Sequence, residues 1–231
     1  MNKIVESVEE AIKDIHSGAR IMVGGFGIAG FPYTLINALA QKEIKDLTIL
    51  CTSSAGWLPF VERDMVKKVI SGFTAHSLRP EITDLIEGKV RSGVLAVETV
   101  PHGILSERIR AHKAGLAGFY TRIGVGTVFA EGKETRVFDG KEYVLERSIG
   151  ADFALIRGHQ GDRFGNIVCR YVARNANVDM AGAATITIAE VEQIVEEGKI
   201  NPDHVTIPGI FVQRLVTAPK IVRWLHGHET L

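Results

Sequence analysis

The chain has 231 residues, 45% hydrophobic and 23% charged, which is enough for one large or two small domains around a sizeable core. Its 27 Lys and Arg residues balance 27 Asp and Glu residues, so a nucleic-acid partner is disfavoured. The N-terminal residues have no apolar stretch typical of a signal peptide, and no run is long enough to cross a membrane. We therefore expect a soluble protein of the cytoplasm.

The first half of the chain predicts alternating helices and strands. Apolar side chains at helical spacing predict an amphipathic helix over 5–15, which Ser17-Gly18 ends. A short apolar run between glycines predicts a buried strand over 19–23. The elements expected next are a helix that begins at Pro32, strands over 46–52 and 68–70, a helix over 82–87, a strand over 94–97 and a helix over 104–114.

The second half predicts a hairpin and further strands. Two alternating runs flank Asp139-Gly140 within residues 135–146, which is a strong hairpin signal. Buried strands are expected over 151–157 and 183–189. The alternation of strands and helices indicates an α/β fold: an open, mostly parallel sheet with helices on both faces, plus a β-hairpin insertion.

Neither the cysteines nor the tail predict a metal site. Cys51 and Cys169 are far apart and match no metal or redox spacing, so two buried thiols in a reducing compartment are expected. His226 and His228 could bind a metal, but a frayed tail is the favoured interpretation. No metal site is therefore predicted.

A glycine-rich segment lies between the first strand and the helix at Pro32. Residues 25–30, GFGIAG, fit the pattern G-x-G-x-x-G. Glycines let the backbone approach a ligand closely, and a helix start offers free N–H groups and partial positive charge. The segment is thus suited to an anion, a carboxylate or an oxyanion.

A dinucleotide is a poor match for this segment. The second strand would have to end in an acid that binds the ribose, about 20 residues after the glycines. That strand ends in Cys51, Thr52 and Ser53, and the nearest acid, Asp46, lies at the opposite end. NAD or flavin binding is therefore disfavoured, and a tight turn without a ligand stays open as an alternative.

Several motifs in fixed order resemble the alpha subunits of family I coenzyme A-transferases. The first is SG…IMVGGFGIAGFP, in which Ser17 stands where the family usually has Asp or Asn. The second is VPHGILSERIR. The motifs occupy residues 17–32, 100–110, 118–127, 131–134, 151–166, 173–175 and 208–212. The resemblance covers about residues 3–218 and is closest to the 3-oxoacid type. It implies a single domain over residues 1–218, followed by a C-terminal tail over 219–231.

The resemblance implies half of an enzyme. The family moves coenzyme A from an acyl-CoA, here with succinyl-CoA as the expected donor, to a short 3-oxoacid or related carboxylate through a glutamyl thioester. The nucleophilic glutamate belongs to the beta subunit, in an S-E-N-G motif that this chain lacks. The resemblance thus implies no catalytic residue in this chain, a beta-subunit partner in an α2β2 heterotetramer, and coenzyme A as co-substrate without a tightly bound cofactor.

The family's motifs also imply where substrates bind. Coenzyme A and its thioester are assigned to Gly24, Gly25, Phe26, Gly27, Ile28, Ala29 and Gly30. Thr34, where some members have Asn, and His102, which replaces the usual Gln, are expected to line the acyl site. Asp162 and Asn166 are expected to stabilise a tight turn, and the helix with Glu107, Arg108 and Arg110 to present a charged, solvated face.

Two other functions remain open. A sugar-phosphate isomerase-like enzyme on a similar fold would need carboxylates of its own chain as general acid and general base, and no Asp/Glu pair occurs near the glycines. The glutamates are expected on helix faces, including Glu192, or in Glu-Arg sequence pairs, including Glu146, none of which has the family's nucleophile context. A non-catalytic sensor that binds a thioester is the second alternative.

Overall fold

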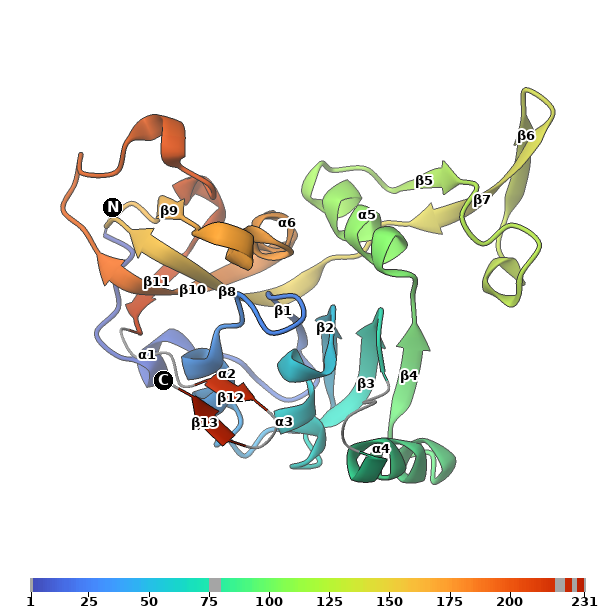
Figure 1. The fold of residues 1–231 in the computed structure, drawn as a ribbon, viewed down its shortest axis with the longest axis horizontal. Coiled ribbons are helices and arrows are strands. Elements are labelled where there is room, and N and C mark those ends of the chain that lie inside the picture. Colours follow the sequence, from blue (N-terminus) through green and yellow to red (C-terminus); the bar gives the residue numbers. More distant parts are fainter. Residues whose placement is uncertain (1, 75–79, 219–222, 226–227, 231) are drawn as a thin grey trace.

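A seven-stranded parallel sheet forms the centre of the molecule (Figure 1). The computed structural model describes residues 2–74, 80–218, 223–225 and 228–230, with side chains up to residue 218. The strand order is β11–β10–β8–β1–β2–β3–β4, and short β9 pairs antiparallel with β8. These strands are β1 (Arg20–Val23), β2 (Leu47–Cys51), β3 (Val66–Ser71), β4 (Ala96–Thr99), β8 (Ala151–Gly161), β9 (Ile167–Val168), β10 (Ala184–Ile194) and β11 (Arg214–Thr217).

Helices cover both faces of the sheet. The α-helices are α1 (Val8–Ala11), α2 (Tyr33–Leu39), α3 (Leu58–Val61), α4 (Pro80–Arg91), α5 (His102–Lys113) and α6 (Asn177–Gly182). The 3₁₀ turns are Ser54–Gly56, Val128–Ala130, Tyr171–Arg174, Pro202–His204 and Gly209–Phe211. Helices α1 to α4 pack on one face, and α5 and α6 on the other. The predicted fold class, an α/β sheet covered on both sides, is confirmed.

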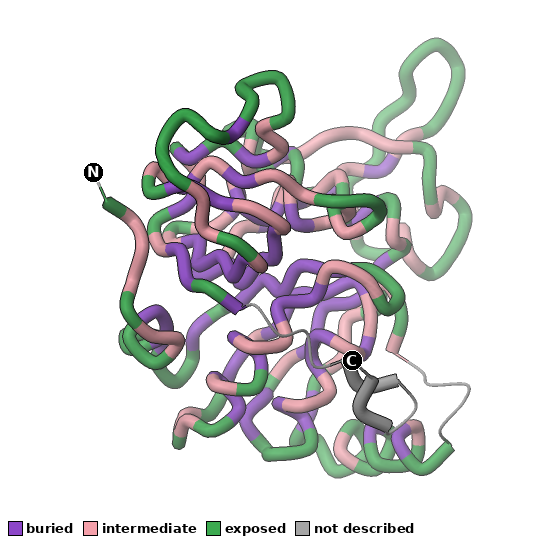
Figure 2. Tube along the Cα trace, turned by 60° about the vertical axis from the view of Figure 1, so that its left-hand side comes forward, coloured by how far each residue is buried: buried purple, intermediate pink, exposed green. Residues whose placement is uncertain are grey.

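Successive residues of the central strands contribute to separate cores. On β1, Ile21 and Val23 belong to the core with α1 to α4, whereas Met22 belongs to the core with α5 and α6. The alternation follows from the two-residue period of a strand. Because both faces are buried, the strands contain continuous apolar runs, and Figure 2 shows them buried beneath exposed loops.

An antiparallel arm projects from the sheet (Figure 1). Strands β5 (Gly118–Thr121), β7 (Lys141–Arg147) and β6 (Thr135–Phe138) pair in that order. Asp139 and Gly140 have φ values of 50° and 72°, so the two residues of the turn both adopt the left-handed conformation that a type I′ hairpin requires. The predicted hairpin is confirmed, while β5 was not predicted.

The N-terminal segment differs from the prediction. The helix expected over 5–15 is short, because only α1 is helical and Ser7 caps it. The preceding residues extend alongside β11, where Val5 N donates to Leu215 O (2.9 Å) and Leu215 N donates to Lys3 O (2.8 Å). The unpaired edge of β11 therefore supplies backbone partners that a helix would not use. Strand β11 itself was not predicted.

Other boundaries also shift. The strand expected over 94–97 is β4, two residues later, and the strand expected over 183–189 extends as β10 to Ile194 because it pairs with the equally long β8. Cys51 is buried as predicted, whereas Cys169 is only partly buried; both are free thiols. Burial raises the pKa of the Cys51 thiol to about 12 and of the Cys169 thiol to about 11.

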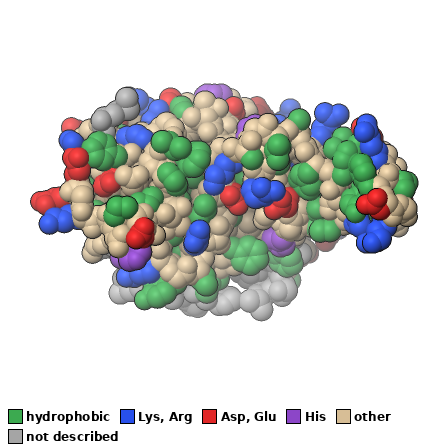
Figure 3. Space-filling model, turned by 90° about the horizontal axis from the view of Figure 1, so that it is seen from above, with side chains coloured by type: hydrophobic (Ala, Val, Ile, Leu, Met, Phe, Trp, Pro, Cys, Tyr) green, Lys and Arg blue, Asp and Glu red, His purple; other side chains and the backbone are tan. Residues whose placement is uncertain are grey.

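Much of the predicted tail over 219–231 lies outside the described residues, as does His226. Its described backbone forms an antiparallel pair, β12 (Arg223–Leu225) with β13 (His228–Thr230). Among the described residues, no helix combines the length and apolar character needed to span a membrane. Positive and negative side chains are interspersed over the face shown in Figure 3, in keeping with the zero formal net charge.

Candidate functional site

Residues 24–30, here called the glycine loop, join β1 to α2 at the carboxyl end of the parallel strands. Phe26 N donates to Ala29 O and Ala29 N donates to Phe26 O, each at 3.0 Å. These two bonds make a tight turn with Gly27 and Ile28 at its tip. Phe26 and Ile28 are 51% and 62% exposed, so the tip presents backbone and apolar side chains to solvent.

The glycines of the loop are required for different reasons. A Cβ on Gly25 (φ +116°) would lie 2.5 Å from the Phe31 ring, and one on Gly30 (φ +76°) would lie 2.7 Å from Ala173 O. Gly27 (φ +59°) has open space where its Cβ would be. Packing therefore demands glycine at the two outer positions, while only backbone conformation favours it at the tip.

Side chains from neighbouring elements hold the carbonyl groups of the loop. Thr52 Oγ1 donates to Gly25 O (2.7 Å) and Asn175 Nδ2 donates to Ala29 O (3.0 Å). The backbone N–H groups of Gly27 and Ile28 have no acceptor among the residues that the structure describes. The loop thus keeps donors available at its tip, which suits an oxyanion or a carboxylate.

The backbone N–H groups at the start of α2 already have an acceptor within the chain, contrary to the prediction that they are free. The buried carboxylate of Glu190 accepts from Leu35 N at 3.0 Å, and Thr34 N also supports its charged form. Pro32 has no N–H to offer. The partial positive charge of this helix end therefore already faces an internal carboxylate, and an external anion would have to use the loop instead.

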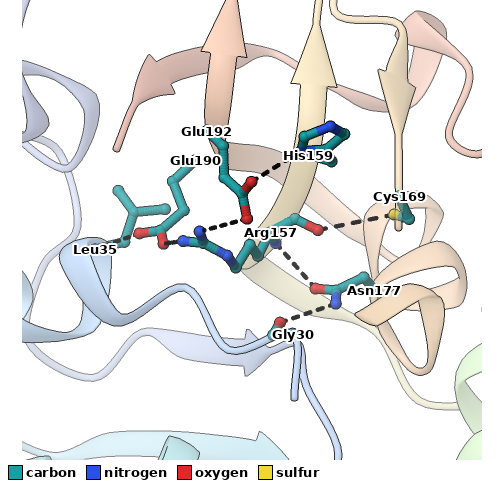
Figure 4. A network of polar contacts seen from close by, with 8 residues as sticks. All are labelled: Gly30, Leu35, Arg157, His159, Cys169, Asn177, Glu190 and Glu192. Atoms are coloured by element: carbon teal, nitrogen blue, oxygen red, sulfur yellow. Dashed lines mark hydrogen bonds and ion pairs between the residues drawn. The ribbon is translucent and has the colours of Figure 1, made fainter. Parts of the chain in front are cut away.

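Glu190 belongs to a buried polar network between β8 and β10 (Figure 4). Its carboxylate pairs with Arg157, which lies directly opposite on the neighbouring strand. Arg157 also donates to Glu192 (3.1 Å), and Glu192 contacts His159 Nδ1 at 2.8 Å. Glu192 lies on β10 rather than on a helix face, so that prediction is wrong.

The two carboxylates of this network differ in their pKa. Burial raises the pKa of Glu190 to about 7, and the Arg157 guanidinium and the Leu35 N–H partly oppose this effect. Burial also tends to raise the pKa of Glu192, but hydrogen bonds from His159 and Arg157 outweigh it, and the net shift is downward. Both carboxylates have partners within this chain, which indicates a structural role.

His102 lies beside the glycine loop at the start of α5. Its Nε2 is 2.8 Å from Thr52 O, and its ring meets the Phe26 ring edge-on at 5.3 Å between centroids. Because a carbonyl can only accept, Nε2 carries a proton, and Nδ1 is an acceptor when the ring carries no second proton. A Cβ on Gly72 would lie 2.5 Å from this ring, so that glycine makes room for it.

The structure brings the predicted residues to one end of the sheet. His102 contacts the loop directly, while Thr34 lies in the first turn of α2, the helix that follows the loop, and is partly buried. A family model described as "Coenzyme A transferase" matches residues 5–218, and the curated relatives agree with it. The chain belongs to the coenzyme A transferase family.

Two relatives illustrate the match. The chain is 44% identical to the A subunit of 3-oxoadipate CoA-transferase from Pseudomonas putida over 220 residues, which cover 94% of each chain. It is 43% identical to the A subunit of a probable succinyl-CoA:3-ketoacid coenzyme A transferase from Bacillus subtilis strain 168, with 94% of this chain and 90% of that one covered. The predicted enzyme class, a CoA-transferase, is confirmed, and both relatives are named as A subunits.

Solved structures of similar fold include CoA-transferases. Glutaconate coenzyme A-transferase from Acidaminococcus fermentans has a TM-score of 0.85 at 24% identity. The match covers 94% of this chain and 76% of the glutaconate coenzyme A-transferase chain. The acyl-CoA transferase YdiF from E. coli O157:H7, as a thioester complex with CoA, has a TM-score of 0.82 at 23% identity. It covers 98% of this chain, which spans about half (49%) of the YdiF chain.

Other motif residues of this CoA-transferase chain are structural. Asp162 Oδ1 accepts from Phe164 N and Asn166 N, each at 3.0 Å, and Asn166 Oδ1 accepts from Gly209 N at 3.0 Å. The predicted role in a tight turn is confirmed. Arg110 pairs with Glu107 on the exposed face of α5, as predicted.

Arg108 does not lie on that solvated face. It is partly buried and donates to Glu98 Oε1 and Arg147 O, each at 2.9 Å. The buried Glu146 pairs with Lys133 rather than with an arginine at hydrogen-bond distance. Arg108 thus connects α5 to β4 of the sheet and to β7 of the arm, whereas the Lys133–Glu146 pair lies within the arm.

No carboxylate of the described residues is bonded to the glycine loop of this CoA-transferase chain. The loop's polar side-chain partners are Thr52, Asn175 and Asn177. Nor do three or more His, Cys, Asp or Glu side chains gather as metal ligands in the described part of the chain. The described site therefore combines hydrogen-bond donors with apolar rings.

Proposed function

We propose that this chain is the A subunit of a CoA-transferase that moves coenzyme A from succinyl-CoA to a short 3-oxoacid. The names of the relatives support the substrates: one acts on 3-oxoadipate, and the other is a probable succinyl-CoA:3-ketoacid transferase. One observation carries the proposal for the site: the glycine loop has unpaired N–H groups at its tip and no carboxylate bonded to it among the described residues.

The reacting carboxylate then comes from a partner chain. The partner's glutamate attacks the thioester carbonyl, and the tetrahedral oxyanion accepts from N–H groups of the glycine loop. Collapse of this adduct releases the coenzyme A thiolate and leaves a mixed anhydride. The thiolate attacks the glutamyl carbonyl, which gives the glutamyl thioester and the free acid. The acceptor carboxylate then attacks the glutamyl thioester. The same steps in reverse give the new acyl-CoA and restore the free glutamate.

Thr34 and His102 are proposed to line the acyl site beside the loop. Thr34 can donate from its hydroxyl group. His102 uses its Nε2 proton for Thr52 O, so a neutral ring presents an acceptor where the family's usual glutamine could donate. This difference changes the hydrogen bonds available to the acyl group.

The remaining parts of the proposal concern assembly and location. The naming of the relatives as A subunits supports a second, different chain in the enzyme. We propose an α2β2 heterotetramer that acts in the cytoplasm, with coenzyme A as co-substrate and no tightly bound cofactor. The mass of the assembled enzyme, measured by light scattering, tests the stoichiometry.

Reconstitution with the partner chain tests the function. The experiment measures transfer of coenzyme A from succinyl-CoA to acetoacetate and to 3-oxoadipate. We expect no measurable transfer by this chain alone and full turnover with the partner that carries S-E-N-G. Robust transfer by this chain alone would contradict the proposed division of labour.

Trapping with borohydride separates transfer from the alternatives. Borohydride reduces a glutamyl thioester, so incubation of the pair with succinyl-CoA and borohydride should abolish activity and modify one glutamate of the partner. A thioester sensor would bind succinyl-CoA without such modification. An isomerase-like enzyme would retain its activity.

A valine at the loop tip tests the proposed oxyanion site. A Cβ on Gly27 would meet no atom of the described chain within 4 Å, and valine adds bulk and backbone strain at the tip that carries the free N–H groups. We expect Gly27→Val to lower kcat/KM of the pair on the order of 100-fold. Gly198→Val is the matched control, because Gly198 also has a positive φ (+80°) and open space. Equal kinetics of the two variants would show that the loop is only a turn.

A further inference from the structure

Asn177 is a completely buried side chain at the start of α6 that lies against both ends of the glycine loop, and Figure 4 shows its contact with the Gly30 end. At the far end of the loop, its Nδ2 donates to Gly30 O at 2.9 Å. At the near end, a Cβ on Gly24 would lie only 1.9 Å from its Oδ1. The same amide therefore sets how closely the loop approaches α6 at its first and last residues.

The hydrogen bonds of Asn177 fix the orientation of its amide. Its Oδ1 accepts from Arg157 N at 3.0 Å, so the opposite side of the group must be the donor. Nδ2 then donates to Gly30 O and to Ala173 O (2.8 Å). Because the amide is buried and its acceptor and donors are all engaged, it has one favoured orientation.

Held carbonyl groups determine where the loop's N–H groups point. In a trans peptide the C=O and the N–H point in opposite directions. Asn175 and Asn177 draw the carbonyls of Ala29 and Gly30 toward α6 and the turn before it, so the N–H groups of Gly30 and Phe31 point away. Besides the unpaired N–H groups of Gly27 and Ile28 at the tip, the N–H groups of Gly30 and Phe31 are therefore backbone donors that face away from α6.

We propose that Asn177 is a positioning residue of the transferase, which orients the glycine loop so that its backbone N–H groups meet the thioester oxyanion. This inference rests on the proposed function. Asn177 does not touch the reacting atoms: it acts through the carbonyl of Gly30. Arg157 connects Asn177 to the start of α2. Its backbone N–H donates to Asn177 Oδ1, and its guanidinium pairs with Glu190, whose carboxylate accepts from Leu35 N.

The test compares two Asn→Asp variants. N177D keeps the shape of the side chain but replaces the two N–H donors by an acceptor that faces the carbonyls of Gly30 and Ala173. N201D is the matched control: Asn201 is exposed, and its Oδ1 accepts from Asp203 N as a 3₁₀-turn cap, a role that Asp fills equally well. Should N177D fail to fold, N177S replaces it, because serine retains one donor.

The first measurement is hydrogen exchange of residues 24–31 in this chain alone, without substrate. We expect the amides of Phe26 and Ala29, which bond each other, to exchange at least about 10-fold faster in the Asn177 variant and at the wild-type rate in N201D. Wild-type exchange in a folded Asn177 variant overturns the inference, whatever the enzyme does.

The second measurement is turnover by the assembled enzyme. We expect kcat per active site to fall at least about 10-fold in the Asn177 variant with a smaller change of KM, since the oxyanion forms only in the transition state. Active sites are counted from the glutamyl thioester trapped with borohydride, so unfolded subunits do not contribute. Unchanged kcat with faster exchange also overturns the inference. A wild-type pair that transfers no coenzyme A instead overturns the proposed function and leaves the exchange result valid.

Discussion

At the scale of single residues, the glycine loop presents backbone N–H groups at its tip and is shaped by side chains outside it. Thr52 lies 27 residues from the loop carbonyl that it holds, and the neighbouring Asn175 and Asn177 lie 146 and 147 residues from theirs. The G-x-G-x-x-G pattern predicts a close approach of backbone and ligand, but it says nothing of these three partners. Their positions depend on how the chain folds around β1 and β8.

Replacing a glycine of the loop by alanine should lower the free energy of unfolding by an amount that depends strongly on the position. Gly25→Ala places its Cβ 2.5 Å from the Phe31 ring at a φ of +116°, so we expect a loss of at least about 2 kcal/mol in the free energy of unfolding. Gly27→Ala meets no atom and carries only the left-handed backbone cost of about 1–2 kcal/mol. Urea unfolding of both variants checks the order, and an equal loss would contradict it.

At the scale of elements, periodicity predicts most strands and helices of the two cores, but not α3, α6 or β11, which also contribute to them. It also predicts the hairpin, because Asp139-Gly140 has a local requirement for positive φ. The buried Arg157–Glu190 pair could not be predicted, since it depends on the register between β8 and β10. The occupied start of α2 escaped prediction for the same reason: its carboxylate is 155 residues away in sequence.

Two glycines at the end of α4 provide a prediction about helix stability. Gly88 lies within α4 and Gly93 just beyond it at a φ of +75°; a Cβ on either would meet no other atom. Gly88→Ala should stabilise the chain by up to about 1 kcal/mol, because alanine favours a helix. Gly93→Ala should destabilise it by about 1 kcal/mol, because it caps the helix in the left-handed conformation. The midpoint temperature of thermal unfolding should therefore rise for Gly88→Ala and fall for Gly93→Ala. A shift of the same sign in both variants would refute this interpretation.

At the scale of the whole molecule, contacts at the β11 edge join the two ends of the matched region. Residues 3–5 pair with β11, and Arg214 forms a two-point ion pair with Asp14, with both N–O distances at 2.6 Å. The N-terminus lies near β9 and β11 in Figure 1. The N-terminal segment thereby covers an edge that could otherwise pair with another chain.

The Asp14–Arg214 pair predicts a pH dependence. Hydrogen bonding to Arg214 lowers the pKa of Asp14 below its ordinary value of 3.8. The pair therefore stabilises the fold at pH values above about 3.8, and this contribution disappears as the pH falls through the lowered pKa. Solvent screens the pair, so Asp14→Asn should cost at most about 1 kcal/mol at pH 7 and nothing at the acid end.

The control for this experiment is Asp84→Asn. Asp84 is exposed on α4 and forms no ion pair within the described part of the chain. Urea unfolding of both variants at several pH values gives the comparison. A penalty for Asp14→Asn that persists at low pH would show that charge is not the cause.

The bridge between Ile4 and Leu215 has a consequence for the connectivity of the chain. The two segments run parallel, so Ala218 and Asn2 are offset by about five strand residues, roughly 16 Å. A flexible linker of about ten residues can join Ala218 to Asn2, and the exposed Asp139-Gly140 turn offers a place for new termini. We expect this circular permutant to fold with the near-UV spectrum of the linear chain 2–218, which is its control. A molten or aggregated permutant would mean that folding needs the natural order in which β1 and β11 are made.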